Sequence, residues 1–427
     1  MTSEDESIKK MMKYRWAIFA VLALAYFFVY FHRTSTAVVG TEIGDAFGVG
    51  AASVSLLGSL YFYAYTVMQL PGGLLADTLG VRKTVFTFLL LAAVGAFLTG
   101  VATDFWVVLM GRILIGAGVA VVYIPIMRAL AMWFRTYEFA SLSGILLAIG
   151  NVGAIAAATP LALMTDALGW EMVFLLLGVI TVILALMCLL IVKDRPTDMG
   201  FPSIQEIEAE ESGNTALLEN VEPVPMLEGM KMAFGGGRKF WPLAIWFFFM
   251  YGSIMVYQGL QAGPYYKNVY AMENFSLMIT LVGVGMIVGC PLSGILSDRV
   301  VKSRRKVLVI GTLLYTVMWA VIWLTAGEFN DMAVQGVINF LFGFFGGWFV
   351  VAYAQIKELF PVAIVGTATA ALNIFPFAGG AVLQSLSGLV VTTGEALAEF
   401  ETLWMFMFIC MIIASIAALL SVEKERA

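Results

Sequence analysis

The sequence predicts an all-α membrane protein in which twelve transmembrane helices form two pseudo-symmetric bundles of six. Three observations support this fold class. Hydrophobic residues make up 61% of the 427 residues and charged residues only 12%, whereas a soluble domain is about half apolar and about a quarter charged. The apolar residues gather in blocks long enough to cross a membrane, and one short motif occurs once in each half of the chain.

The apolar blocks are best explained as helices. A membrane-spanning helix needs about 20 mostly apolar residues, and lipid offers no partner to free backbone groups, so each block is expected to be helical. Continuous apolar runs do not fit the alternating strands of a membrane barrel. The twelve expected helices cover 16–39, 53–76, 83–103, 105–134, 139–163, 170–192, 240–263, 276–297, 306–326, 332–357, 362–390 and 401–421.

The basic residues predict how these helices are oriented. With both termini in the cytoplasm, all but four of the 24 lysines and arginines fall in cytoplasmic segments. The exceptions are Lys267, in an outer loop, and Arg33, Arg112 and Arg128, inside helices. This is the positive-inside pattern. It predicts a multi-pass protein of the inner or plasma membrane with cytoplasmic termini, and we expect its first helix to be retained rather than cleaved as a signal peptide.

The chain is expected to divide into an N-terminal bundle (1–192), a cytoplasmic linker (193–239) and a C-terminal bundle (240–427). The linker is the only long polar stretch and carries a glutamate-rich run, which is typical of a solvated segment or a regulatory docking site. "PGGLLADTLGVRK" follows the second helix of the first half, and "CPLSGILSDRVVKSRRK" follows that of the second. Parallel six-helix repeats with a site between them are a transporter architecture.

These motifs resemble the signatures of the major facilitator superfamily over the whole chain. The loop signature matches at Gly73, Leu75, Ala76, Asp77, Gly80, Arg82 and Lys83, and its second copy at Gly294, Leu296, Ser297, Asp298, Arg299 and Arg305. "RILIGAG" (112–118) resembles the helix-4 motif, and "KELFPVAIVGT" (357–367) the junction of helices 10 and 11. The resemblance implies the twelve-helix fold of that family and transport by alternating access.

We expect five residues of these motifs to act in gating: Asp77, Arg82, Arg112, Asp298 and Arg299. Aspartates at cytoplasmic helix ends can pair with basic neighbours and so latch the halves together in one state. The alternative is an ordinary surface salt bridge, worth under about 1 kcal/mol. Arg112 is expected to bond backbone carbonyl groups of neighbouring helices.

The membrane interior suggests an anionic substrate. No Asp or Glu falls within the expected helical cores, whereas Arg33 and Arg128 do. A charge at the bilayer centre costs at least about 2.5 kcal/mol, so a charged residue there is expected to have a structural or functional role. Arginine presents a planar fork that matches a carboxylate or phosphate. The alternative for both residues is that they extend to the nearest headgroups.

Two short stretches narrow the resemblance. "FHRTS" (31–35) and "RALAMWF" (128–134) resemble the anion:cation symporter branch of the superfamily, and the organophosphate antiporters also carry a helix-1 arginine. In these relatives both arginines line the substrate site, and the acidic residue before the helix-1 arginine is associated with proton coupling. Helix 7 lacks the basic residue that the organophosphate branch usually has, which argues against a phosphate substrate.

His32 takes the place of that acidic residue and is the only histidine. Because histidine titrates near neutral pH, His32 is a candidate proton-coupling group. The alternative is a neutral ring that forms an interhelical hydrogen bond in a uniporter or exchanger. Polar side chains in the expected helices supply the other candidate substrate contacts: Tyr30, Tyr61, Tyr65, Tyr257, Gln258, Gln261 and Asn373.

The sequence therefore predicts a secondary active transporter of a small carboxylate-bearing organic anion or zwitterion, with a proton as a candidate co-substrate. The alternatives are an anion exchanger, a dipeptide carrier or a membrane sensor of the same fold. No nucleotide-binding loop, metal cluster or nucleophile–base constellation is visible, so we expect neither an enzyme nor a bound metal or cofactor. A net charge of −5 gives no indication of a nucleic-acid partner, and we expect a monomer embedded in the bilayer.

Overall fold

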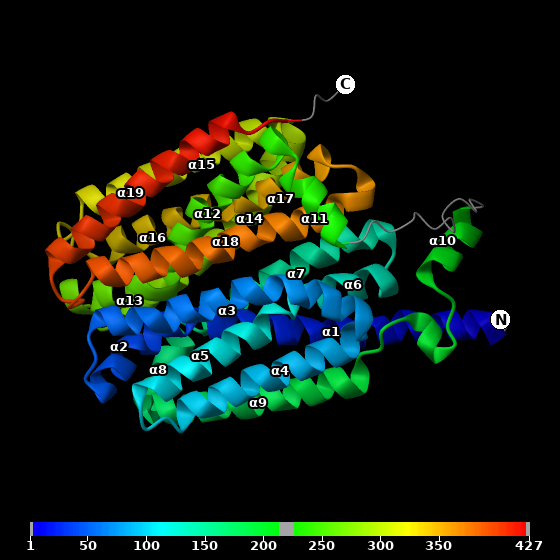
Figure 1. Cartoon of the computed structure of the whole chain (residues 1–427), viewed down its shortest axis with the longest axis horizontal. Coiled ribbons are helices and arrows are strands. Elements are labelled where there is room, and N and C mark those ends of the chain that lie inside the picture. Colours follow the sequence, from blue (N-terminus) through cyan, green and yellow to red (C-terminus); the bar gives the residue numbers. More distant parts are fainter. Residues whose placement is uncertain (1–2, 213–225, 424–427) are drawn as a thin grey trace.

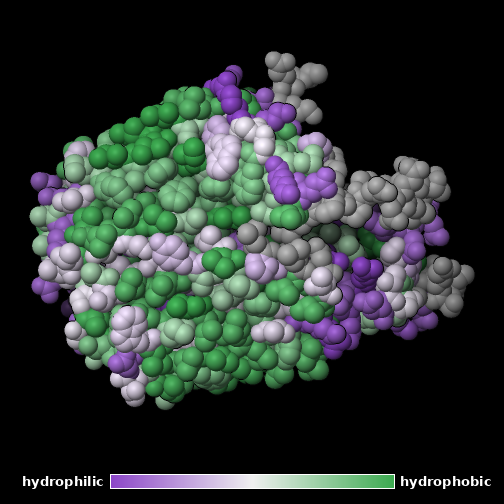
Figure 2. All heavy atoms as spheres, in the orientation of Figure 1, coloured by the Kyte–Doolittle hydropathy of each residue, from purple (hydrophilic) through white to green (hydrophobic). Residues whose placement is uncertain are grey.

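The computed structural model describes residues 3–212 and 226–423. It contains twelve helices that are long and apolar enough to cross a membrane, which confirms the fold class that the sequence predicts. They form two groups that lie side by side, with both termini at the same end (Figure 1). Figure 2 shows hydrophobic side chains over the middle of this face and hydrophilic ones gathered toward its ends, as lipid requires.

The first group is built from the N-terminal half. Its elements are α1 (Ser3–Thr34), α2 (Thr36–Phe47), α3 (Ala51–Thr78), α4 (Gly80–Gly100), α5 (Phe105–Ala120), α6 (Tyr123–Trp133), α7 (Thr136–Ala156), α8 (Thr159–Leu168) and α9 (Trp170–Ile191). Three expected helices are each interrupted once and appear as the pairs α1–α2, α5–α6 and α7–α8. At the first interruption, the Ser35 hydroxyl donates to the backbone carbonyl of His32 (3.1 Å).

The second group is built from the C-terminal half. Its elements are α12 (Trp241–Val256), η4 (Tyr257–Gln261), α13 (Ala262–Pro264), η5 (Tyr265–Val269), α14 (Phe275–Ile295), η6 (Leu296–Val300), α15 (Arg304–Leu324), α16 (Met332–Gly346), η7 (Gly347–Phe349), α17 (Val350–Leu359), α18 (Val362–Val390) and α19 (Leu397–Leu420). The seventh membrane helix runs from α12 to η5, which is longer than expected, because two π-helical segments, η4 and η5, continue it.

The segment between the halves is partly structured. It contains η1 (Pro196–Met199), α10 (Ile204–Ser212), α11 (Met226–Phe234) and η3 (Gly237–Lys239). The amphipathic helix α11 packs against α18 and buries Met230 and Ala233. Residues 213–225 of the expected linker lie outside the described residues. The part of the expected linker next to the second half therefore contains a helix that packs against α18, and it is not fully solvated.

Contacts between the two halves run along α3 and α18. We call the end of the molecule that lies away from the termini the distal side, and the end that carries them the terminal side (Figure 1). On the distal side, Gln261 donates to the Ser55 hydroxyl (3.4 Å), and the hydroxyl groups of Thr159 and Thr280 are 3.0 Å apart. Gly263 approaches so closely that a Cβ there would collide with the carbonyl oxygen of Ala37. Nearer the terminal side, Asn373 donates to Gln69 (3.4 Å).

Candidate anion-binding site

Arg33 lies at the contact between the two halves, in the last turn of α1. The helix is interrupted at Ser35, two residues later, and Arg33 is only 7% exposed. Its guanidinium donates to the hydroxyl of Tyr65 in the first half (3.4 Å) and to that of Tyr251 in the second (3.3 Å). Both bonds are long, and Nε has no hydrogen-bond partner among the described residues. The guanidinium therefore keeps donor capacity for a further acceptor.

Aromatic rings surround this guanidinium. Its carbon atom is 4.3 Å from the centre of the Tyr30 ring, 5.5 Å from that of Tyr65 and 5.2 Å from that of Phe377. The rings attract a cation through their faces and exclude water. No Asp or Glu is among the buried side chains that the structure describes, so no buried carboxylate neutralises Arg33. An anion would therefore meet a desolvated and incompletely bonded arginine.

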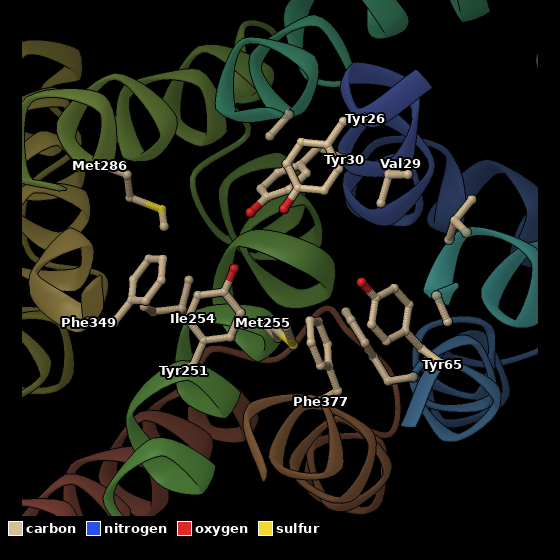
Figure 3. Close-up of a cluster of buried hydrophobic side chains, with 14 of the residues drawn as sticks. Tyr26, Val29, Tyr30, Tyr65, Tyr251, Ile254, Met255, Met286, Phe349 and Phe377 are labelled. Carbon is tan, nitrogen blue, oxygen red and sulfur yellow. The ribbon is translucent and has the colours of Figure 1, made fainter. Parts of the chain in front are cut away.

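A small cavity adjoins Arg33 between the halves. Its volume is about 20 Å³, which is room for about one water molecule. Tyr30, Asn151, Tyr251 and Gln258 contribute polar atoms to its lining. Figure 3 shows the hydroxyl groups of Tyr30, Tyr65 and Tyr251 pointing toward one another, with Met255 and Met286 nearby. The site is nearly closed in this conformation.

The structure brings four of the nine expected substrate contacts together here: Arg33, Tyr30, Tyr65 and Gln258. It adds Tyr251, which the sequence reasoning missed. Tyr251 lies seven residues before Gln258, and this spacing places two side chains on the same face of a helix. The seven-residue spacing from Gln258 is the sequence signal that would have identified Tyr251.

Four other expected contacts lie away from this cavity. Tyr257 is fully buried inside the second half, where its hydroxyl bonds Tyr266 and Asn339 (both 3.0 Å). Gln261 belongs to the distal contact. Tyr61 lies beneath the guanidinium of Arg112 (4.7 Å). Asn373 accepts from Tyr353 (2.5 Å) on the terminal side of the cavity.

Arg128 is half-buried on α6, at a different depth from Arg33. Tyr123, at the start of the same helix, packs its ring against Tyr26 of α1 (5.4 Å between ring centres). Tyr26 packs in turn against Tyr30 (5.2 Å). A row of three tyrosine rings therefore runs from the helix of Arg128 to the ring beneath Arg33, and the two arginines do not share one binding point.

His32 faces away from the cavity that Arg33 adjoins. Its ring is fully buried, and Nε2 lies 3.3 Å from the Thr181 hydroxyl on α9, inside the first half. It is not among the side chains that line the cavity. This position matches the alternative of an interhelical hydrogen bond.

Arg112 bonds the backbone of two neighbouring helices, as the sequence predicts. Its Nε donates to the Leu57 carbonyl on α3 and its Nη1 to the His32 carbonyl on α1, both at 3.1 Å. The second bond satisfies a carbonyl group at the break after α1. Arg112 therefore supports the turn of chain that carries Arg33.

Comparison with known proteins agrees with this architecture. The model of the family described as Major Facilitator Superfamily matches residues 22–382 and, in a second match, residues 273–427. The chain belongs to the Major Facilitator Superfamily. Its membership confirms the resemblance seen in the sequence, and relatives in this superfamily carry transporter names.

Several superfamily relatives are named for small anions. A probable sulfoacetate transporter of Cupriavidus necator is 25% identical over 346 residues, covering 79% of this chain and 78% of the relative. A probable galactarate/D-glucarate transporter of Escherichia coli K12 is 24% identical and covers 90% of both chains. A probable hexose phosphate transport protein of Chlamydia trachomatis is 24% identical, covering 89% of this chain and 86% of that one.

Solved superfamily structures share the fold. A bacterial homologue of the human lysosomal transporter Spinster, in an inward-facing and unoccupied conformation, has a TM-score of 0.71 at 16% identity and covers 95% of this chain and 96% of its own. A mutant of the nucleoside transporter NupG has a TM-score of 0.70 at 14% identity and covers 95% of this chain and 99% of its own. The chain thus shares its fold with these two solved transporters.

The superfamily loop motif of the second half forms an ionic cluster on the terminal side. Arg304 pairs with Asp298 of the motif and with Glu358 at the end of α17 (3.1 Å). The sequence reasoning named Arg299 instead, but Arg299 is exposed, and Arg304 makes the connection. Arg304 is the first residue of α15, and its side chain reaches both η6 and α17.

In the first half, Arg82 binds within its own bundle. Its backbone N–H donates to Asp194 (2.8 Å) and its Nε to the Leu189 carbonyl (2.5 Å). The side chain of Asp77 lies outside the described residues, so its expected gating role stays a prediction. A second ion pair missed by the sequence reasoning joins Arg15 of α1 to Glu138 of α7 (2.7 Å). Each half thus ties its terminal side together with an arginine–carboxylate pair.

Proposed function

We propose that this chain is a secondary active transporter that moves a small carboxylate-bearing organic anion, and that Arg33 binds the anion. The observation that carries the proposal is the burial of Arg33 between the halves without a described carboxylate partner. An unpaired buried charge is costly, and an arriving carboxylate would offset this cost with charge-assisted hydrogen bonds. The names of the superfamily relatives, which refer to small anions, support the same class of substrate.

The contacts between the halves support transport by alternating access. The distal contacts close the path on one side of Arg33, while the polar bond between Asn373 and Gln69 bridges the halves toward the other. If the distal contacts broke while the bond between Asn373 and Gln69 stayed, or the reverse, Arg33 would be exposed to one side of the membrane at a time. We propose that the terminal side is cytoplasmic, on the positive-inside pattern, and that the membrane is the inner or plasma membrane.

The position of His32 supports transport that is not coupled to protons through this residue. Its ring lies against Thr181 of α9 and does not line the cavity. The proposal is therefore an exchanger, or a symporter whose coupling group is another residue.

The proposal is tested with purified protein in proteoliposomes. A thermal-shift screen of carboxylates, sulfonates and phosphates first identifies a bound anion, because a ligand of the folded state raises its stability. Arg33→Gln is then expected to lower affinity for that anion by at least about 30-fold, since it removes one partner of a buried charged pair. Arg33→Lys should recover little of it, because lysine has no planar fork.

Arg238→Gln is the matched control, since Arg238 is exposed on η3, before the start of α12, and does not line the cavity. It should bind and transport as the unaltered protein does. Wild-type binding and uptake by Arg33→Gln would overturn the assignment of Arg33.

A further inference from the structure

Arg33 and Arg128 lie at different depths in the membrane interior. Tyr26 and Tyr123 lie level, because their rings are in contact. Arg33 follows Tyr26 by seven residues on a helix that runs toward the distal side, and Arg128 follows Tyr123 by five on a helix that runs the other way. At 1.5 Å per residue, their Cα atoms differ by roughly 18 Å in depth. Arg128 is accordingly not among the residues that line the cavity beside Arg33.

The cavity offers no other positive charge. Arg33 is the only charged residue among those that line it, all of which belong to the described part of the chain. Tyr251 and Gln258 offer neutral polar groups, and Phe62, Met255 and Met286 offer apolar surface. Figure 3 shows Met255, Met286 and Ile254 beside Tyr251. Thioether side chains adapt to apolar groups of varied shape.

Two hydroxyl groups can complete the recognition of a single carboxylate. Tyr65 and Tyr251 accept from the guanidinium of Arg33, and they come from different halves. A phenol can accept from arginine and can equally donate to an anion. A carboxylate next to Arg33 would therefore lie within reach of one donor from each half.

We infer that the site takes a small monoanion, with one carboxylate on Arg33 and an uncharged, largely apolar body against Met255, Met286 and Phe62. This inference rests on the proposed function and goes further, because a second negative charge would be buried here without a cation to pair with. The selectivity thus differs from what the names of the dianion-transporting relatives would suggest for this chain.

The first test compares defined anions on the wild-type protein. The probes are 4-methyl-2-oxopentanoate and phenylacetate as monoanions with apolar bodies, and sulfoacetate, D-glucarate and glucose 6-phosphate as dianions, at neutral pH. The monoanions are expected to bind at least about tenfold more tightly in competition assays. Equal or tighter binding of the dianions would overturn the inference while leaving an anion transporter in place.

The second test adds the missing charge. Gln258→Lys places a second cation on the cavity wall and is expected to improve binding of sulfoacetate or D-glucarate by about tenfold or more relative to the monoanions. Gln258→Met has a similar size but no charge, and should show no such change. An equal gain in both variants would overturn the inference, because charge would then not be the deciding property.

The tests separate this inference from the proposed function. If no probe of either class binds, or if Arg33→Gln binds them all as the wild type does, the proposed function itself is wrong. If Gln258→Lys fails to fold, the comparison of probes on the wild-type protein still decides the inference.

Discussion

At the scale of single residues, two neighbours on α1 have separate environments. Successive residues of a helix point about 100° apart, so Arg33 faces the cavity while His32 faces α9. The Arg112 bond to the His32 carbonyl and the Ser35 hydroxyl bond to the same carbonyl hold the break that follows. This arrangement assigns the two residues different tasks, although the sequence places them side by side.

The contact of His32 with Thr181 leads to a prediction. Thr181→Val removes this interhelical hydrogen bond and should lower the free energy of unfolding by about 1 kcal/mol, whereas His32→Gln removes the titratable ring but keeps a group that can bond the Thr181 hydroxyl. Transport by both variants should keep the pH dependence of the wild type, measured as anion uptake at several external pH values. Loss of pH-gradient-driven accumulation in His32→Gln alone, with Thr181→Val unaffected, would instead make His32 the coupling group.

At the scale of elements, the seventh membrane helix is the one that departs most from a regular helix. It passes from α12 through the π-helical segments η4 and η5, which are separated by the short α13. π-helical turns are frequent at functional sites. Here the α12 part carries Tyr251 to the cavity, and α13 carries Gly263 to the distal contact with Ala37. One element therefore joins the candidate site to the closure of the distal side.

This contact predicts that a methyl group at Gly263 keeps the distal side open. Gly263→Ala should reduce transport by about tenfold or more, because a Cβ there collides with backbone across the halves and not with a side chain that can move. Accessibility of a cysteine introduced at Ser55 to a water-soluble maleimide should rise in the same variant.

Gly144→Ala is the matched control, since a Cβ at that position on α7 meets open space. It should transport normally and gain slightly in stability from better helix propensity. Normal transport by Gly263→Ala as well would show that the distal contact does not need to close this tightly.

At the scale of the whole molecule, charge is distributed unequally between the two ends. The terminal side carries most lysines and arginines, and the ion pairs of Arg15 with Glu138 and of Arg304 with Glu358 lie there. Arg304 links α15 to η6 and α17, so it ties together three parts of one half. Such pairs hold each half as a unit while the contact between the halves changes.

The charge distribution predicts the orientation in the cell membrane. In a variant whose Cys188, Cys290 and Cys410 are replaced by serine or alanine, Glu328→Cys should react with a membrane-impermeant maleimide on intact cells. Thr197→Cys should react only after the cells are permeabilised. Both positions are exposed, so accessibility within the protein is matched. The reverse labelling pattern would mean that the termini lie outside.

The sequence by itself determined that the protein lies in a membrane, how many helices cross it and to which family the chain belongs. These properties depend on the length of the apolar blocks and on local motifs, and neither of these depends on which distant segments the block or motif contacts. It also pointed to Arg33, because a charge in an apolar block is costly wherever it finally lies. The bonding of Arg112 to backbone carbonyl groups, which its place in the helix-4 motif led us to expect, is confirmed.

The tertiary structure alone decided which polar side chains meet. Gln258 reaches the cavity while its neighbour Tyr257 is enclosed within the second half, because helix rotation and the π-helical segment set the direction of each. The partnership of Tyr251 with Arg33 joins residues 218 positions apart, and Arg304 rather than Arg299 pairs with Glu358. Such pairings depend on how whole helices pack against one another, and packing is a property of the assembled halves that no single segment contains.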